Sequence, residues 1–133
     1  MDKRILITGA GGFIGGFIVQ EAINRGYETW AAVRKSTNRK FLVDERINFI
    51  ELDFTDPQAL HDTLQQHVAE HGKWHYVVHN LGATKATNYI DFENINYYYM
   101  KLLVDTLKDI EAVPEVFLLM SSLVRQTLSR YCS

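Results

Sequence analysis

An apolar strand that runs directly into three spaced glycines constrains this chain more than any other feature. Ile5, Leu6 and Ile7 lead through Thr8 into the glycines, which stand at positions 9, 12 and 15. Side chains must be absent where a strand turns tightly into a helix, where a diphosphate touches the backbone and where that helix packs on the sheet. The helix then offers unpaired N–H groups and the positive end of its dipole to an anion. The spacing therefore predicts a site for a dinucleotide diphosphate.

Glycine triplets also occur in ordinary turns and helix caps, so the context of this triplet matters. After the glycines, apolar residues recur at helical spacing, and Gly26 provides a stop. The apolar residues of this predicted helix are Ile14, Phe17, Ile18, Ala22 and Ile23. A strand, a glycine turn and an amphipathic helix in this order are typical of the start of a β-α-β unit.

The rest of the chain alternates apolar strands and helices without a repeat or a linker. We expect further strands at 29–33, 47–52, 74–79 and 116–120, a helix that begins at Asp56-Pro57, and a long helix at 91–110. Leu60, Leu64 and Val68 form one face of the helix after Asp56. Apolar strands separated by helices predict an α/β fold, a Rossmann-type doubly wound parallel sheet of order 3-2-1-4-5. Its ligand crevice is expected at the carboxyl ends of strands one and four.

Composition and charge narrow the possible functions. A chain of 133 residues with 47% hydrophobic residues predicts one globular domain. The net charge of −2 and the single basic cluster at 34–40 argue against a nucleic-acid partner. No long apolar run or signal peptide is expected, and hence no membrane partner. The lone Cys132 cannot form an internal disulfide, which fits a cytoplasmic location.

Five motifs in order make the chain resemble the extended short-chain dehydrogenase/reductases, a family of sugar-nucleotide epimerases, dehydratases and dihydroflavonol-type reductases. The resemblance runs from Lys3 to about Leu123, and the segment 8–15 is similar to the family's TGxxGxxG element. It implies that Asp53, followed by Phe54, binds the adenine amino group, and that Asn80, Leu81 and Gly82 pass along the cofactor. It also implies that Asn96 is the family's helix asparagine and that Ser122 is its active-site serine.

Each of these residues also has a purely structural interpretation. Asp53 or Asp56 could cap the following helix, although Asp56 suits that role better. Asn96 could be an ordinary surface position on a helix, and Ser122 could be a strand-end hydroxyl that stabilises a turn. Without the resemblance, neither Asn96 nor Ser122 would be singled out.

The end of the second strand predicts the choice of cofactor. A site selective for NAD has an acid there for the ribose 2′-OH, about 20 residues beyond the glycines, whereas NADP needs a cation. In this chain Val33 occupies that position, and Arg34 and Lys35 follow it. A guanidinium can bind a 2′-phosphate with two N–H groups and stack on adenine. NADP is therefore expected, with NAD as the alternative, unless the basic run is only a solvated loop.

These arguments give one set of predicted ligand contacts and no metal site. The predicted cofactor-binding residues are Gly9, Gly11, Gly12, Phe13, Ile14, Gly15, Arg34, Lys35, Asp53, Phe54, Asn80, Leu81, Gly82 and Asn96. His67 and His71 are one helical turn apart, but no third ligand accompanies them, so packing is the favoured interpretation.

The catalytic machinery that the resemblance implies is incomplete. In the family, a Tyr and a Lys four residues later, on the helix after strand five, act as general acid and base. Only eleven residues follow Ser122, and they do not resemble the family, so Ser122 is the one predicted catalytic remnant. Tyr97 and Lys101 have the Tyr-x-x-x-Lys spacing, but they lie before strand five and are better explained by helix packing.

We therefore expect a Rossmann domain at 1–123, truncated after strand five, and a C-terminal tail of uncertain structure at 124–133. The predicted function is the NAD(P)-binding portion of an epimerase/dehydratase-like oxidoreductase, inactive as this short chain. A non-catalytic NADP-binding or sensing module is the alternative. A full-length form would also take a small-molecule substrate, and the helix at 91–110 is expected to mediate self-association.

Overall fold

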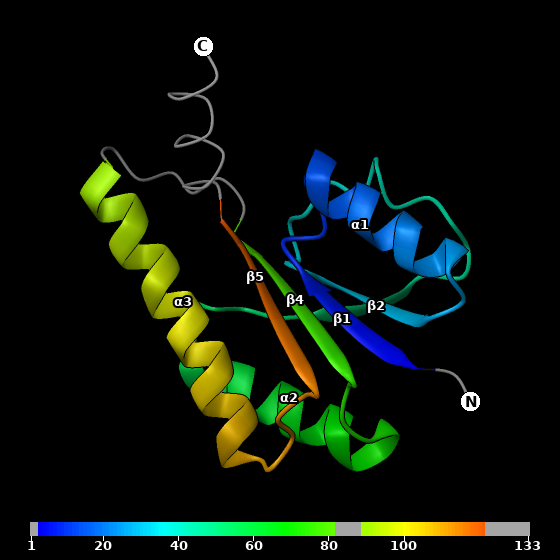
Figure 1. Ribbon diagram of the computed structural model, residues 1–133. Coiled ribbons are helices and arrows are strands. Elements are labelled where there is room, and N and C mark those ends of the chain that lie inside the picture. The colour runs from blue at the N-terminus through cyan, green and yellow to red at the C-terminus, as the bar shows by residue number, and fades with distance from the viewer. Residues whose placement is uncertain (1–2, 82–88, 122–133) are drawn as a thin grey trace.

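The computed structural model describes residues 3–81 and 89–121, which form a parallel sheet flanked by helices (Figure 1). The elements are β1 (Arg4–Thr8), α1 (Phe13–Asn24), β2 (Glu28–Val33), β3 (Asn48–Glu51), α2 (Pro57–His71), β4 (Tyr76–Leu81), α3 (Tyr89–Asp109) and β5 (Val116–Ser121). The strand order is β3-β2-β1-β4-β5, and all four pairings are parallel. The predicted Rossmann-type order 3-2-1-4-5 is confirmed.

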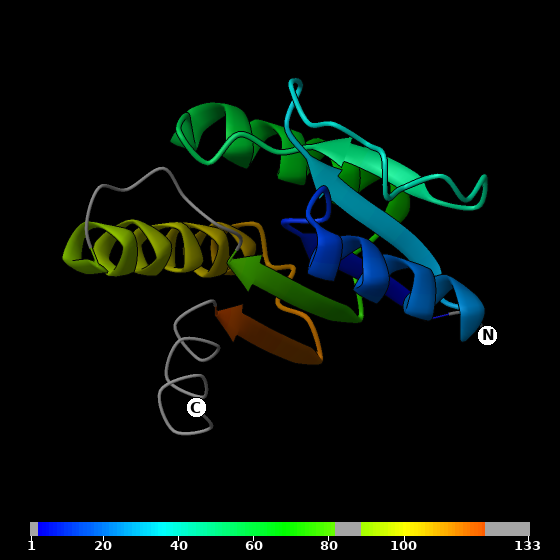
Figure 2. The same cartoon turned by 90° about the horizontal axis from the view of Figure 1, so that it is seen from above.

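The helices cover both faces of the sheet, with α1 on one side and α2 and α3 on the other (Figure 2). Alternate residues of β1 show this division, because Ile5 and Ile7 pack with α1, whereas Leu6 packs with the α2 and α3 side. Leu6 and Ile7 are fully buried. A central strand with both faces covered explains the uninterrupted apolar run that the sequence shows.

The helix α2 begins where the sequence predicts it. The Asp56 side chain accepts a hydrogen bond from the backbone N–H of Ala59 at 3.1 Å, and Pro57 follows in the first turn. Leu60 and Leu64 are fully buried on the face toward the sheet. Gly72 ends the helix with φ +85°, a conformation that favours glycine.

The structure corrects one residue of the predicted apolar face of α1, of which Ala22 and Ile23 are buried as expected. Phe17, which the spacing places among the apolar contacts, is 68% exposed. The buried residues of α1 are Gly15, Gly16, Val19, Ala22 and Ile23. The two glycines let the helix approach its neighbours closely on their side, so this side, and not the bulkier one, faces the core.

Strand boundaries differ from the prediction by one or two residues. The predicted strand at 74–79 is β4 and begins at Tyr76, whereas Trp74 is 1% exposed in the connection that precedes it. In the described part of the chain, no helix combines the length and apolar composition needed to cross a membrane.

Candidate functional site

The carboxyl ends of β1 and β4 form the predicted crevice and are held together by direct contacts. Thr8 and His79 are opposite each other in the two strands, and the Thr8 hydroxyl is 2.6 Å from Nδ1 of His79. The side-chain amide of Asn80 donates to the carbonyl of Gly9 at 3.2 Å. Gly9 has φ +60°, and a Cβ there would overlap the carbonyl oxygen of Asn80. Gly9 is therefore required by the turn itself.

Gly15 is required for a different reason. A Cβ at this position would overlap the carbonyl oxygen of Gly9 and lie 2.8 Å from the Cα of Ala10. The first turn of α1 thus packs directly on the backbone that leaves β1. This is the close helix packing expected of the third glycine in such a turn.

Gly12 has no such internal explanation. Its φ is −80°, which other residues adopt readily, and a Cβ built on it meets no atom of residues 3–81 and 89–121 within 4 Å. It is the N-cap of α1, yet it offers no side chain to cap the first N–H groups. The open space in front of unpaired N–H groups fits a bound diphosphate, whose approach a side chain would obstruct.

The end of β2 presents a cation. Val33 is 4% exposed and closes the strand, and the exposed Arg34 follows it. Lys35 is also exposed. This arrangement fits the predicted contact with a 2′-phosphate, and no acid side chain takes the place of Val33.

Asp53 lies just after β3. Thr55 donates to its Oδ1 from both the backbone N–H, at 2.9 Å, and the hydroxyl, at 2.5 Å. These hydrogen bonds hold the pKa of Asp53 below its usual range, and the charge of Arg34 lowers it further. The carboxylate is thus ionised, and because Oδ2 has no hydrogen-bond partner among the described residues, it can accept from an amino group.

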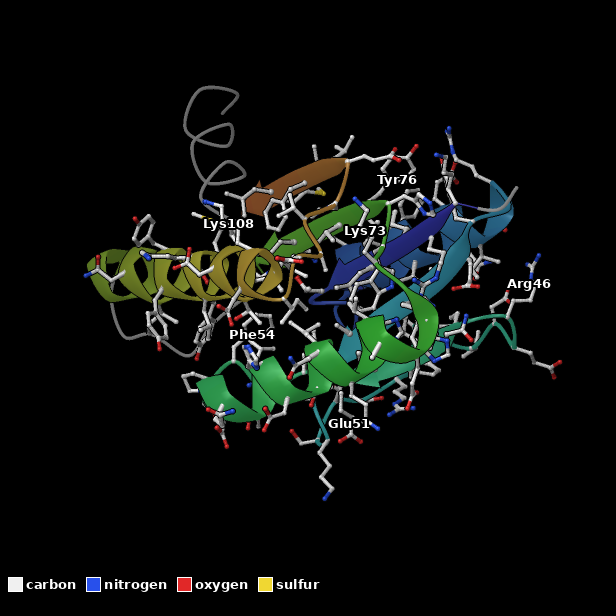
Figure 3. All side chains as sticks on the ribbon, turned by 90° about the horizontal axis from the view of Figure 1, so that it is seen from below. Arg46, Glu51, Phe54, Lys73, Tyr76 and Lys108 are labelled. Carbon is white, nitrogen blue, oxygen red and sulfur yellow. The ribbon has the colours of Figure 1, made fainter. Side chains whose placement is uncertain are left out.

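Of the other predicted cofactor-binding residues, some lie near the glycine turn and one lies in the core. Phe13 is 72% exposed at the start of α1, and Ile14 is half-buried. Phe54 lies between α2 and α3 (Figure 3), and its ring packs 5.6 Å from that of His79 and 5.5 Å from that of Tyr99, measured between centroids. Phe54 therefore contributes to the core on the helix side.

The remaining predicted residues lie in or beyond β4, α3 and β5. Asn96 is 5% exposed in α3, and its Nδ2 has no hydrogen-bond partner among residues 3–81 and 89–121. It is thus not the surface residue of the alternative interpretation. Leu81 is the last residue of β4. Gly82, Ser122 and the tail 124–133 lie outside the described residues.

Neither Tyr97 nor Lys101 lies toward the crevice. Tyr97 is 60% exposed on α3. The ammonium of Lys101 is 2.6 Å from Asp105, one helical turn away, and this hydrogen bond raises the pKa of Lys101. A tyrosine exposed to solvent and a lysine already paired with Asp105 do not suit a role beside a reacting carbonyl.

The histidine pair of α2 is part of an aromatic cluster. The guanidinium of Arg4 donates to Nε2 of His67 at 2.8 Å, so that nitrogen is already in use. The ring of His67 stacks on Trp74 with centroids 4.2 Å apart. The ring of His71 lies against the ring of His67, with centroids 4.7 Å apart. These contacts support the packing interpretation.

Two contacts of this region were not predicted. Thr37 packs against Gly11, and Phe41 packs against Gly16, so the loop after β2 lies on the glycine turn. The sequence signal for these contacts is the presence of glycines at 11 and 16 in addition to the spaced triplet. A glycine inside a helix, as at position 16, often marks a close approach.

Comparison with known proteins identifies the family. The model of the NAD dependent epimerase/dehydratase family matches residues 5–124. The chain belongs to this family. The resemblance to extended short-chain dehydrogenase/reductases is thereby confirmed, and the family is one that depends on a nicotinamide dinucleotide.

Solved structures share the fold of this family member. The enzyme WbmG of Bordetella bronchiseptica, solved in complex with NAD, has a TM-score of 0.66 and 20% identity. The match covers 90% of this chain and 37% of WbmG. A UDP-glucose 4-epimerase also has a TM-score of 0.66 and 20% identity, over 88% of this chain and 35% of the epimerase. The chain spans about a third of the length of these structures.

Curated relatives match over a shorter segment. The fatty acid hydroxylase uhd1 of Mycosarcoma maydis is 37% identical over 69 residues, 48% of this chain and 23% of the relative. A decarboxylating sterol-4-alpha-carboxylate 3-dehydrogenase of Dictyostelium discoideum is 30% identical over 63 residues, 47% of this chain and 19% of the relative.

Proposed function

We propose that this chain is the cofactor-binding part of an epimerase/dehydratase-type oxidoreductase and that its cofactor is NADP. The observation that carries the proposal is the open space at Gly12, in front of the first N–H groups of α1. The described part of the chain gives no reason for a glycine there, whereas a diphosphate does. Family membership and the NAD complex of WbmG support a nicotinamide dinucleotide as the ligand.

Each contact of the proposed site has a separate role. The first N–H groups of α1 bind the diphosphate, and the ionised Asp53 accepts from the adenine amino group through Oδ2. Arg34 binds the 2′-phosphate, which explains why a cation follows Val33 where an NAD site has an acid. When bound, the nicotinamide would supply hydride transfer, and these residues orient it.

The proposed substrate of a full-length form is a sugar nucleotide or a small carbonyl compound. The UDP complex of WbmG and the name of the UDP-glucose 4-epimerase support the first class. The sterol dehydrogenase among the relatives supports adding a hydroxylated sterol to any substrate panel. We expect the 133-residue chain itself to bind cofactor without turnover, because the only Tyr-x-x-x-Lys pair of the described residues faces solvent.

Calorimetric titration of the purified chain with NADPH and with NADH tests the proposal. We expect tighter binding of NADPH, and Arg34→Ala should reduce the difference by about 1–3 kcal/mol, the contribution of a charge-assisted hydrogen bond. Equal affinity, or preference for NADH, would refute the choice of NADP. Absence of binding to both would refute the cofactor site.

Turnover separates the enzyme from the alternative, a non-catalytic binding or sensing module. Oxidation of NADPH should be measured with the 133-residue chain and with any longer product of the same gene. Turnover by the longer product alone supports the enzyme. Brisk, substrate-dependent oxidation by the short chain would contradict the proposal and restore Tyr97 and Lys101 as candidates, because losing a positioned acid or base typically costs 10²–10⁴-fold.

A further inference from the structure

The loop between β2 and β3 is docked on the glycine turn at two points. A Cβ built on Gly11 would overlap Cγ2 of Thr37, and a Cβ built on Gly16 would lie 2.7 Å from Cβ of Phe41. Figure 1 shows this loop running alongside α1. Neither glycine has a positive φ, so the backbone conformation does not require them. Both are explained by the space that the loop occupies.

Thr37 also closes the turn that contains Arg34. Its hydroxyl oxygen accepts a hydrogen bond from the backbone N–H of Arg34 at 2.8 Å, and its own N–H donates to the carbonyl of Arg34 at 3.0 Å. One residue thus contacts the glycine turn with its methyl group and fixes the backbone of Arg34 with its hydroxyl and amide groups.

We propose that Thr37 is a positioning residue for cofactor selection, which holds Arg34 beside the glycine turn so that the guanidinium meets the 2′-phosphate of NADP. The inference rests on the proposed function, because it assigns Thr37 to the same site. Gly11 is the complementary part of the contact, and its role is to accept the Thr37 methyl group rather than to touch the ligand.

The physical reason is preorganisation. Arg34 lies in an exposed loop with Lys35, Arg39 and Lys40 and no acidic residue before Asp44. An untethered loop would have to lose conformational freedom when NADP binds, at the expense of affinity. A loop already docked through Thr37 has lost that freedom on folding. NAD lacks the 2′-phosphate, so its binding depends less on the loop.

A compensating pair of substitutions at Gly11 and Thr37 tests the proposal. Gly11→Ala adds a Cβ that overlaps Cγ2 of Thr37, and Thr37→Ser removes Cγ2 while it keeps the hydroxyl. After Cγ2, the next atoms near the added Cβ are at 3.7 and 3.8 Å, which is ordinary contact. The two substitutions should therefore compensate each other in the double variant. Thr37→Ser alone is the matched control.

Affinities for NADPH and NADH should be measured for all four proteins. We expect Gly11→Ala to weaken NADPH binding roughly tenfold or more, the loss of about one charge-assisted hydrogen bond. Binding of NADH should change much less. Gly11→Ala/Thr37→Ser should restore the wild-type ratio. Thr37→Ser loses the methyl contact but keeps both hydrogen bonds to Arg34, so its ratio should lie between those of the wild type and Gly11→Ala.

Trypsin provides a readout that does not depend on the cofactor. The loop contains four exposed Lys and Arg residues, so undocking should accelerate cleavage between residues 34 and 40 in Gly11→Ala and not in the double variant. An unchanged NADPH to NADH ratio in Gly11→Ala, with a wild type that prefers NADPH, overturns this inference alone. A wild type without that preference overturns the proposed cofactor as well.

Discussion

The carbonyl of Gly9 accepts a hydrogen bond from the side chain of Asn80, and the carbonyl of Asn80 lies where a Cβ of Gly9 would stand. The carboxyl ends of β1 and β4 are thus fixed to each other at the point where the strand order reverses. In open α/β sheets, ligands bind at this point. Stability and ligand binding therefore depend on neighbouring residues of one turn, and substitutions should separate the two.

Gly15→Ala should destabilise the protein much more than Gly12→Ala. At Gly15 the added Cβ would overlap the backbone of Gly9, so we expect a loss of about 2–4 kcal/mol of folding free energy, typical of overpacking with backbone displacement. At Gly12 the Cβ meets nothing, so the folding free energy should change by less than about 1 kcal/mol. Urea unfolding of both variants measures the difference.

A larger side chain at Gly12 tests ligand binding. Gly12→Val should abolish dinucleotide binding in a folded protein, because its side chain would fill the space proposed for the diphosphate. Normal binding of NADPH by a folded Gly12→Val would show that the glycine is only part of a structural turn.

The fold was predictable because local patterns and the packing rules agree. The apolar runs, the Asp56-Pro57 helix start and the glycine turn each indicate the element that forms, and right-handed crossovers leave one strand order. Phe17 was assigned wrongly because helical spacing alone does not say which of two apolar stripes is buried. The glycines on the other side of α1 decided that question through close packing.

The site was predictable only at positions where a single physical requirement, such as a positive φ or close packing, explains the residue. The positive φ of Gly9 and the close packing of Gly15 follow from the spacing of the triplet. The contact of Thr37 with Gly11 joins residues of two different loops, and no local pattern reports their distance. The environment of Phe54 likewise depends on how α3 lies against the sheet.

Asp56→Ala should destabilise the protein by about 1 kcal/mol, because the N–H of Ala59 would lose the carboxylate that caps it. Asp56→Asn is the matched control, since an amide oxygen can accept the same hydrogen bond. Thermal unfolding of the two variants measures the cap. Equal losses for Asp56→Ala and Asp56→Asn would indicate that charge, and not the hydrogen bond, stabilises the helix start.

Self-association through α3 is expected to depend on its exposed tyrosines. Tyr97 is 60% exposed and Tyr98 is 50% exposed. Burial of such rings typically contributes about 1–2 kcal/mol each, so Tyr97→Ser/Tyr98→Ser should weaken dimerisation at least tenfold in sedimentation equilibrium. Val113→Ser, at an apolar position that is 50% exposed beyond α3, is the control. If the control weakens association as much, another surface mediates it.

Stability should fall as the pH decreases from about 6.5 to about 4, because of His79. Burial lowers its pKa from 6.5 to about 4, and no charged group is among the causes of that shift. The unfolded chain therefore binds a proton in this interval while the folded chain does not, and the free energy of unfolding decreases by about 1–3 kcal/mol. His67, whose pKa is also lowered to about 4, adds to the same slope.

A substitution isolates the contribution of His79. His79→Gln keeps a polar partner for the Thr8 hydroxyl, 2.6 Å away in the native protein, but removes the titrating group. Urea unfolding at pH 7.0, 5.5 and 4.5 should give a flatter dependence of stability on pH for the variant than for the wild type. The comparison does not depend on the stability of the variant at pH 7, because only the slope of the free energy of unfolding against pH measures proton uptake on unfolding. A slope equal to that of the wild type would mean that the pKa of His79 is the same in the folded and the unfolded chain.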